Sequence, residues 1–242
     1  MKTFLNVLNL EDDADDAELN RAMLSARWPQ CQLTRVDRPE AFLGALEEGG
    51  FDLILSDFTM PGFGGQQALA MARERCPQIP FLFVSGTIGE DTAIEAMKNG
   101  ATDYVLKHRL VRLIPAVDRA LREVADREER ERAEKAMRES EHKYRELFEC
   151  LAEAAFLADE QSGRIIDANR CAEKMLGCSR QEILGRNQKQ FLALDKLIAD
   201  GGTLRLCHLL RPDGSTILVD LRTTYLTLHG RKLVLRLCYE LT

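Results

Sequence analysis

The chain has 242 residues, of which 45% are hydrophobic and 30% are charged, a balance that fits about two soluble globular domains. Its formal net charge of -6 and its pI near 5.4 argue against a nucleic-acid-binding surface. No apolar stretch approaches the roughly 20 residues that span a bilayer, and no signal peptide precedes the first apolar run, so a cytoplasmic protein is expected.

Seven cysteines are scattered along the chain without a Cys-x-x-Cys pair. Their number is odd and their spacing irregular. We therefore expect reduced, buried thiols rather than disulfides or a zinc site.

Short apolar runs punctuate the first half of the chain. Each is rich in aliphatic or aromatic residues, and we expect strands at residues 4–10, 32–36, 53–56, 81–85 and 103–106. Helices are expected between them, and Gly100 stands where the fourth would end. The alternation predicts an α/β fold with a doubly wound, five-stranded parallel sheet that is covered on both faces.

Charged side chains follow three of these runs, where each strand would end. Glu11 and Asp12 follow the first run, Asp57 follows the third and Lys107 follows the fifth. Because the carboxyl ends of parallel strands meet in one crevice, these groups are expected to lie together. Carboxylates at close range repel unless a divalent cation lies between them, and oxygen ligands with open water positions favour Mg²⁺. With the ammonium of Lys107, the site could neutralise a transferring phosphoryl group, for which Asp57 would be the acceptor.

These residues make residues 1–122 resemble the receiver domain of response regulators. The motifs that carry the resemblance are Glu11-Asp12, Asp57-Phe58-Thr59-Met60-Pro61-Gly62, Val84-Ser85-Gly86-Thr87 and Lys107. The resemblance implies a flavodoxin-like sheet with strand order 2-1-3-4-5. It also implies phosphorylation of Asp57, with Lys107 and the Ser85 hydroxyl as catalytic groups.

The same resemblance implies roles for the neighbouring residues. The implied Mg²⁺ ligands are Glu11, through water, Asp12, Asp57 and the backbone carbonyl of Thr59. Tyr104 occupies the position of the family's rotating aromatic residue and would follow Ser85 inward on phosphorylation. One position departs from the family, because His108 follows Lys107 where proline is usual. We therefore expect a trans Lys107–His108 peptide bond and a shifted loop.

From Leu113 the sequence reads as helix well beyond the end of a receiver. A first coiled-coil seam alternates spacings of three and four, at Ile114, Val117, Leu121 and Val124. A charged stretch follows, in which acids stand four residues before bases, as Glu128 does before Arg132. A second seam in another phase comprises Ala133, Met137, Ser140, Tyr144, Leu147 and Leu151. We expect a helical coiled-coil linker at residues 123–143 and a parallel dimer, with a single solvated helix as the alternative.

Residues 144–242 resemble a PAS domain. The resemblance rests on Tyr144-Arg145-Glu146-Leu147-Phe148-Glu149, Ala155-Phe156-Leu157-Ala158-Asp159, Gly163-Arg164-Ile165-Ile166-Asp167-Ala168-Asn169 and Ser179-Arg180-Gln181-Glu182-Ile183-Leu184-Gly185. Three strands in hairpin order follow at 204–210, 216–228 and 233–239, with turns at Pro212-Asp213-Gly214 and His229-Gly230. Ser179 and Glu182 indicate a capping box, Asn169 can cap the preceding helix and Gly177 ends it. The resemblance implies an α+β domain whose five-stranded antiparallel sheet and short helices enclose an apolar pocket.

Two cofactors known from PAS domains are not expected here. Gln188 stands where the flavin-binding, light-sensing branch has its adduct-forming cysteine. Haem-binding relatives use an axial histidine on the helix near residues 187–199, a segment that contains none, and His208 and His229 lie on a strand and in a turn. We expect no flavin or haem, but a module that is empty or holds a small ligand.

Together these patterns predict two-component signalling. A histidine kinase or phosphotransfer protein would phosphorylate Asp57, and the change would pass through the linker to a dimeric PAS module. The alternatives are a ligand or light sensor with the receiver as a docking domain, and a dimeric structural adaptor. Whether the protein is an enzyme stays open, since only self-catalysed phosphorylation and dephosphorylation of Asp57 are expected. Glu240-Leu241-Thr242 resembles the triplet that couples a PAS domain to its next module. We therefore expect the N-terminal part of a longer histidine kinase or diguanylate cyclase, whose output domain would follow, with a stand-alone two-module regulator as the alternative.

Overall fold

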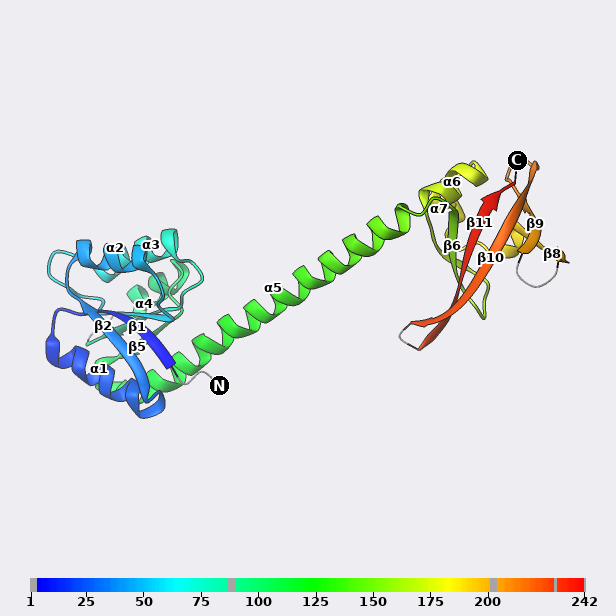
Figure 1. Ribbon diagram of the computed structural model, residues 1–242. Helices are drawn as coiled ribbons and strands as arrows, with labels where there is room; N and C mark the ends of the chain where they lie inside the picture. The colour runs from blue at the N-terminus through cyan, green and yellow to red at the C-terminus, as the bar shows by residue number, and fades with distance from the viewer. Residues whose placement is uncertain (1–3, 87–89, 201–203, 229, 242) are drawn as a thin grey trace. The chain divides into compact units, whose positions relative to one another are not determined.

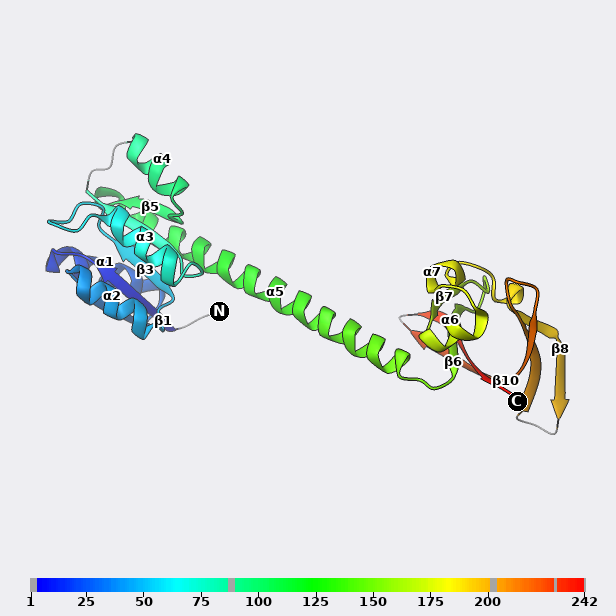
Figure 2. The same cartoon turned by 90° about the horizontal axis from the view of Figure 1, so that it is seen from above.

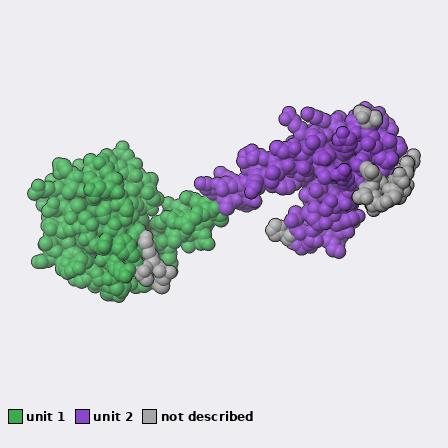
Figure 3. Space-filling view, viewed as in Figure 1, with its two compact units in different colours: residues 1–134 green, residues 135–242 purple. Residues whose placement is uncertain are grey.

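The computed structural model describes residues 4–86, 90–200, 204–228 and 230–241 (Figure 1). Thr87, His229 and Thr242, which belong to motifs named above, lie outside the described residues. The chain divides into two compact units, residues 1–134 and 135–242, which Figure 3 colours separately. Each unit is described by itself below.

The first unit is built on a five-stranded parallel sheet. Its strands are β1 (Phe4–Leu10), β2 (Gln30–Val36), β3 (Leu53–Ser56), β4 (Phe81–Ser85) and β5 (Asp103–Leu106). They lie in the order β2-β1-β3-β4-β5, and every neighbouring pair is parallel, which confirms the predicted fold class. β3 and β4 are buried along their whole length, which explains why their sequences are continuous apolar runs without alternation.

Helices cover both faces of this sheet (Figures 1 and 2). α2 (Pro39–Glu48), α3 (Gly65–Arg75) and α4 (Glu90–Lys98) contribute to one apolar core, which includes Phe42, Leu69 and Phe83. α1 (Ala14–Arg27) and the start of α5 (Leu113–Glu149) contribute to the other core, through residues such as Leu24 and Val117. The strand ends therefore stand on a sheet that is packed from both sides.

α5 is one helix of 37 residues that belongs to both units. Ala116 and Val117 are buried in the core of the first unit, and Leu121 packs against it. The prediction of a first coiled-coil seam is thereby corrected, because the same spacing also suits a helix that packs on a sheet. In the second seam, Met137 and Leu147 are exposed. None of the described helices, α5 included, is both long and apolar enough to cross a membrane.

The second unit holds an antiparallel sheet with short helices. Its strands are β6 (Ala154–Asp159), β7 (Ile165–Ala168), β8 (Leu192–Asp200), β9 (Leu204–Leu210), β10 (Thr216–Leu228) and β11 (Arg231–Glu240). They lie in the order β7-β6-β11-β10-β9-β8. β9, β10 and β11 are the three strands whose ranges were expected from sequence. The expected number of five strands is corrected to six, because β8 pairs with β9 at the edge of the sheet. In the segment that corresponds to the axial-histidine helix of haem-binding relatives, residues 187–199, a 3₁₀ turn (Gln188–Gln190) leads into β8.

The short helices α6 (Arg170–Leu176) and α7 (Arg180–Ile183) are bounded by the predicted signals. Asn169 Oδ1 accepts a hydrogen bond from the Ala172 N–H at 2.9 Å, which caps α6. Gly177 ends α6 with a φ of 73°, a conformation that glycine adopts without strain. Glu182 Oε2 accepts the N–H of Ser179 at 2.8 Å, as a capping box requires.

Candidate functional site

Three charged residues stand directly after strands of the parallel sheet. Glu11 follows β1, Asp57 follows β3 and Lys107 follows β5. β1 and β3 are neighbours, and the N–H of Asp57 donates to the carbonyl of Leu10 at 2.9 Å. The parallel sheet thus brings residues from distant parts of the sequence to one edge.

The ammonium of Lys107 lies among three carboxylates. Its Nζ is 2.7 Å from Asp57 Oδ2, 3.1 Å from Glu11 Oε1 and 2.6 Å from Asp16 Oδ2. Burial would lower the pKa of Lys107, but the hydrogen bonds to these carboxylates outweigh it and raise the pKa above its ordinary value. Lys107 therefore carries a permanent positive charge beside Asp57.

Asp57 is held from two sides. While Oδ2 contacts Lys107, Oδ1 accepts the N–H of Thr59 at 3.1 Å. Gly65, the first residue of α3, approaches so closely that a Cβ there would lie 2.7 Å from the Asp57 carbonyl oxygen and 2.7 Å from the ring of Phe83. The absence of a side chain at Gly65 therefore allows α3 to begin against the strand end that presents Asp57.

Glu11 is almost completely buried, with 1% of its surface exposed. The pKa of Glu11 is raised to about 7, because burial and the nearby Asp57 carboxylate together outweigh the opposing effect of the Lys107 ammonium. Ionised Glu11 is thus stabilised by nearby positive charge. Arg35 holds the backbone here, with Nε 2.9 Å from the Glu11 carbonyl oxygen.

Glu11, Asp12 and Asp57 form an acidic cluster. One carboxylate oxygen from each lies within 4.8 Å of the others. Ligands on opposite sides of Mg²⁺ stand about 4.2 Å apart, since each bond is about 2.1 Å, so the spacing of the cluster suits one ion held directly or through a bound water. Lys107 contacts two of these carboxylates and that of Asp16, so the four acids exceed its single positive charge, and a divalent cation would offset the difference. The residues present therefore fit Mg²⁺.

Asp16 was not among the residues predicted from sequence. The acidic stretch that contains Asp16 is visible in the sequence, but the sequence does not show where the Asp16 side chain points. Asp13 Oδ1 accepts the N–H of Asp15 at 2.8 Å and begins α1. Three residues later, Asp16 faces Lys107. An N-cap followed by an acid three positions on was the available signal.

Ser85 and Tyr104 lie on the two strands beside this edge. Ser85 ends β4, is 2% exposed, and pairs in register with the last residue of β5. Tyr104 is half-buried, opposite Phe83, three residues before Lys107. The Lys107–His108 peptide bond is trans, as predicted, and the chain turns there into a 3₁₀ helix.

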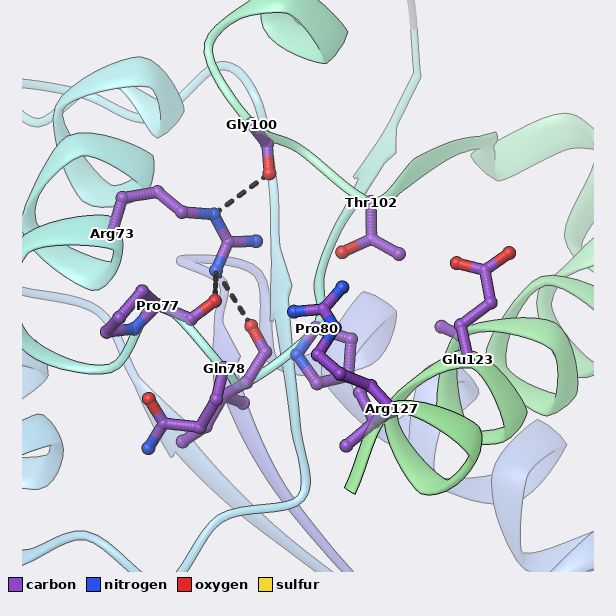
Figure 4. Close-up of a pocket in the computed structure, with 11 residues that line it drawn as sticks. Arg73, Pro77, Gln78, Pro80, Gly100, Thr102, Glu123 and Arg127 are labelled. Carbon is purple, nitrogen blue, oxygen red and sulfur yellow. Dashed lines mark hydrogen bonds between the residues drawn. The ribbon is translucent and has the colours of Figure 1, made fainter. Parts of the chain in front are cut away.

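A pocket of about 140 Å³ lies at the opposite edge of the sheet (Figure 4). Its Arg73 Nε donates to the Gly100 carbonyl at 2.9 Å, and Nη1 donates to the carbonyls of Pro77 at 3.2 Å and Ile79 at 2.8 Å. The arginine therefore ties together the two connections that enter β4 and β5. Because these connections precede the strands, the pocket lies away from the acidic cluster.

A polar cluster in the second unit fixes the last turns of α5. Asp167 of β7 accepts hydrogen bonds from Tyr144 Oη at 3.0 Å, Arg145 Nη1 at 3.2 Å and Arg180 Nε at 2.9 Å. Burial would raise the pKa of Asp167, but the three donors outweigh it and hold the pKa below its ordinary value. Asn169 Nδ2 adds a bond to a carbonyl of α5 at 3.3 Å. The end of α5 is thus bonded directly to β7.

Two protein families match the chain. Residues 7–118 match the response regulator receiver domain, and residues 142–207 match the PAS domain. The chain therefore carries a receiver domain followed by a PAS domain. The receiver segment is also similar to curated response regulators and transcriptional regulatory proteins.

Individual similar proteins include the response regulator protein FleR of Pseudomonas aeruginosa, 41% identical over 76 residues, which are 31% of this chain and 16% of FleR. The transcriptional regulatory protein FixJ of Bradyrhizobium diazoefficiens is 33% identical over 108 residues, 44% of this chain and 51% of FixJ. The chain thus spans no more than about half the length of either relative.

Among solved structures, NtrX from Brucella abortus has a TM-score of 0.49 and 24% identity. The match covers 53% of this chain and 29% of the NtrX chain. The PAS domain of an HTR-like protein from Haloarcula marismortui has a TM-score of 0.39 and 24% identity. The match covers 46% of this chain and 99% of that PAS domain.

Proposed function

We propose that the chain is a phosphorylation-controlled signalling protein with a receiver at residues 1–122, a helical linker at 123–143 and a PAS domain at 144–242. Asp57 accepts a phosphoryl group from a histidine kinase or phosphotransfer protein, and the change passes along α5 to the PAS domain. The observation that carries this proposal is the 2.7 Å contact between Lys107 Nζ and Asp57 Oδ2 inside an acidic cluster at the strand ends.

In the proposed phosphoryl transfer, the protein forms only one covalent bond. A carboxylate oxygen of Asp57 forms the new bond to phosphorus, the bond from phosphorus to the donor's imidazole nitrogen breaks, and the leaving imidazole takes up a proton. Lys107 is placed to offset negative charge on the phosphoryl oxygens, because its Nζ already contacts the acceptor. The hydroxyl of Ser85, at the end of β4, would donate to one of those oxygens.

The acidic cluster would hold the metal ion. Asp12, Asp57 and the backbone carbonyl of Thr59 would bind Mg²⁺ directly and Glu11 through water, and the bound ion would neutralise the phosphoryl oxygens. Thr59 is suitably near, since its N–H already contacts Asp57. On phosphorylation, Tyr104 would follow Ser85 inward and change the surface of the receiver.

α5 is suited to carry that change because both of its ends are attached. Val117 is buried in the receiver core, and Tyr144 and Arg145 bond to Asp167 of the PAS domain. Residues 125–144 of the helix are exposed. In this proposal two copies pair through the linker and the PAS domain, so that a shift of α5 alters the dimer.

A small phosphodonor tests the proposal without a cognate kinase. The protein is incubated with Mg²⁺ and phosphoramidate, and bound phosphate is measured by mass spectrometry of the intact chain. We expect one phosphate per chain in the wild type, none in Asp57→Asn and little without Mg²⁺. Asp126→Asn is the matched control, because Asp126 is an exposed aspartate of the linker and should leave the reaction unchanged.

Two outcomes would contradict this function. One is a wild-type protein that takes up no phosphate although its circular dichroism shows a folded receiver. The other is undiminished phosphorylation of Asp57→Asn.

A further inference from the structure

Arg236 lies in the middle of the core face of the PAS sheet. β11 is an interior strand, and Arg236 pairs with Phe156 of β6 on one side and Thr223 of β10 on the other. Along β11 its neighbours on the same face are Val234 and Cys238, both members of the apolar core. A guanidinium thus stands where the strand pattern calls for an apolar side chain.

The guanidinium has no partner that would explain its burial. Arg236 is 8% exposed, and its buried Nε and Nη1 atoms have no hydrogen-bond partner among the described residues. Burial lowers its pKa, and the titratable groups that act on it are Tyr225, Cys238 and Cys207, none of which is a carboxylate. The side chain nevertheless stays protonated at neutral pH, as arginine does in proteins.

Asp220, a buried acid of the same sheet, does not pair with Arg236. Asp220 of β10 is 7% exposed, but it pairs in register with Tyr239, and its neighbours in sequence, Val219 and Leu221, are the residues that face the core. Side chains alternate along a strand, so Asp220 points to the opposite face from Arg236. It meets Arg222 there, with Nε and Oδ2 3.9 Å apart.

A buried charge without a partner destabilises a folded protein, and natural structures therefore pair buried charges or use them to bind something. We propose that Arg236 is the anchor of a ligand site in the PAS core, and that the ligand is a small organic anion with one carboxylate and an apolar body. This binding function goes beyond phosphoryl transfer at Asp57 and does not depend on it.

The surroundings of Arg236 select this class of ligand. The planar guanidinium matches a carboxylate, with two parallel hydrogen bonds. Apolar core residues lie around Arg236 on this face, with Phe156, Val234 and Leu221 among them. A second charge on the ligand would find no described partner on that face, whereas an aromatic or short aliphatic body would replace water at apolar side chains.

The test measures binding of defined probes to the full chain by isothermal titration calorimetry and by thermal shift. Benzoate and butyrate combine a carboxylate with an apolar body. Benzyl alcohol has the body without the charge, and acetate and inorganic phosphate have the charge without the body. We expect benzoate or butyrate to bind and raise the Tm of the PAS transition, with the other three binding at least roughly tenfold more weakly.

Arg236→Met removes the charge and keeps an unbranched side chain. We expect it to weaken binding of the carboxylate probe at least roughly tenfold and, without ligand, to leave the PAS transition as stable as in wild type or more so. Arg231→Met is the matched control, since Arg231 lies on the same strand but is exposed, and it should bind as wild type does.

The proposal is overturned if neither benzoate nor butyrate binds the folded wild type, or if Arg236→Met binds them equally well. It is also overturned if acetate or phosphate binds as tightly as benzoate, because the site would then be a general anion site. The probe measurements on wild type remain decisive even if Arg236→Met does not fold. Repeating them in Asp57→Asn, without a phosphodonor, keeps failure here distinct from failure of phosphorylation.

Discussion

The carboxylate of Asp16 lies 2.6 Å from the ammonium of Lys107, as close as the 2.7 Å contact that the same nitrogen makes with Asp57. Two aspartates, one on a helix and one at a strand end, thus share a single lysine. Asp16 therefore takes part in positioning the charge that faces the proposed phosphoacceptor.

Asp16→Asn removes one negative charge from the cluster and keeps the shape of the side chain. We expect the Mg²⁺ concentration that half-saturates phosphorylation to rise roughly threefold to tenfold, since each nearby carboxylate strengthens cation binding. The measurement is a Mg²⁺ titration of phosphoramidate-driven phosphorylation. Asp15→Asn removes the same charge from the same helical turn at an exposed position and should shift the midpoint less. Equal shifts in both variants would argue against a role for the contact with Lys107.

Lys107→Gln should destabilise the receiver. Glu11 and Asp57 are both buried, and loss of the ammonium would leave them facing each other. Removing one partner of a buried ion pair costs about 3 kcal/mol, and we expect a loss of that order at pH 8 in urea unfolding. Lys98→Gln, at an exposed lysine, is the control and should change the free energy of unfolding by less than about 0.5 kcal/mol.

Asp167→Asn should loosen the attachment of α5 to the PAS domain. It weakens hydrogen bonds from Arg145, Arg180 and Tyr144 at once, and we expect the PAS transition to lose about 2 kcal/mol. Tyr144→Phe removes one of these bonds and should cost about 1 kcal/mol. Tyr239→Phe alters an exposed tyrosine of the same domain and should cost almost nothing. If the two tyrosine variants behave alike, the Tyr144–Asp167 bond contributes nothing to stability.

Because of the Asp167 carboxylate, the stability of the PAS domain should depend on pH. The pKa of Asp167 in the folded protein lies below its ordinary value of 3.8, so the charged form stabilises the fold. That contribution is fully present above the unfolded pKa and is lost as the pH falls through the folded pKa. We therefore expect the difference in unfolding free energy between wild type and Asp167→Asn to be constant near pH 6 and to shrink below 3.8. A constant difference down to pH 2 would contradict this.

The exposed apolar residues of α5 predict self-association. Met137 is 72% exposed and Leu147 is 63% exposed, and both belong to the second heptad seam. We expect sedimentation over a concentration series to show a dimer and Met137→Glu to weaken it at least roughly tenfold, because a charge would be buried in the seam. Val111→Glu is the control, since Val111 is 76% exposed but lies outside the seam. A strict monomer at high micromolar concentration would reject the dimer.

Much of the architecture was readable in the sequence because it rests on local signals. Four of the five receiver strands begin and end where the apolar runs do, and Gly177 and Ser179 mark helix boundaries as predicted. The edge strand β8 was missed. The resemblance to PAS domains implies five strands for this sheet and gives no reason to expect a sixth.

Side-chain partners were harder to predict because they depend on contacts between distant parts of the chain. The three-and-four spacing around Val117 is the same whether a helix packs on a sheet or on another helix, and only the fold shows that this residue lies in the receiver core. Asp16 looked like one acid among several until α1 aimed it at Lys107.

The sequence by itself determined the two domains and the strand ends that carry Glu11, Asp57 and Lys107, because strand length, apolar period and motif order are properties of neighbouring residues. Two side-chain environments were decided by the tertiary structure alone. It placed Asp16 beside Lys107 and left the charge of Arg236 without a described partner inside an apolar sheet face. The physical reason is that burial and charge pairing are set by residues far apart in the chain, which no local pattern encodes.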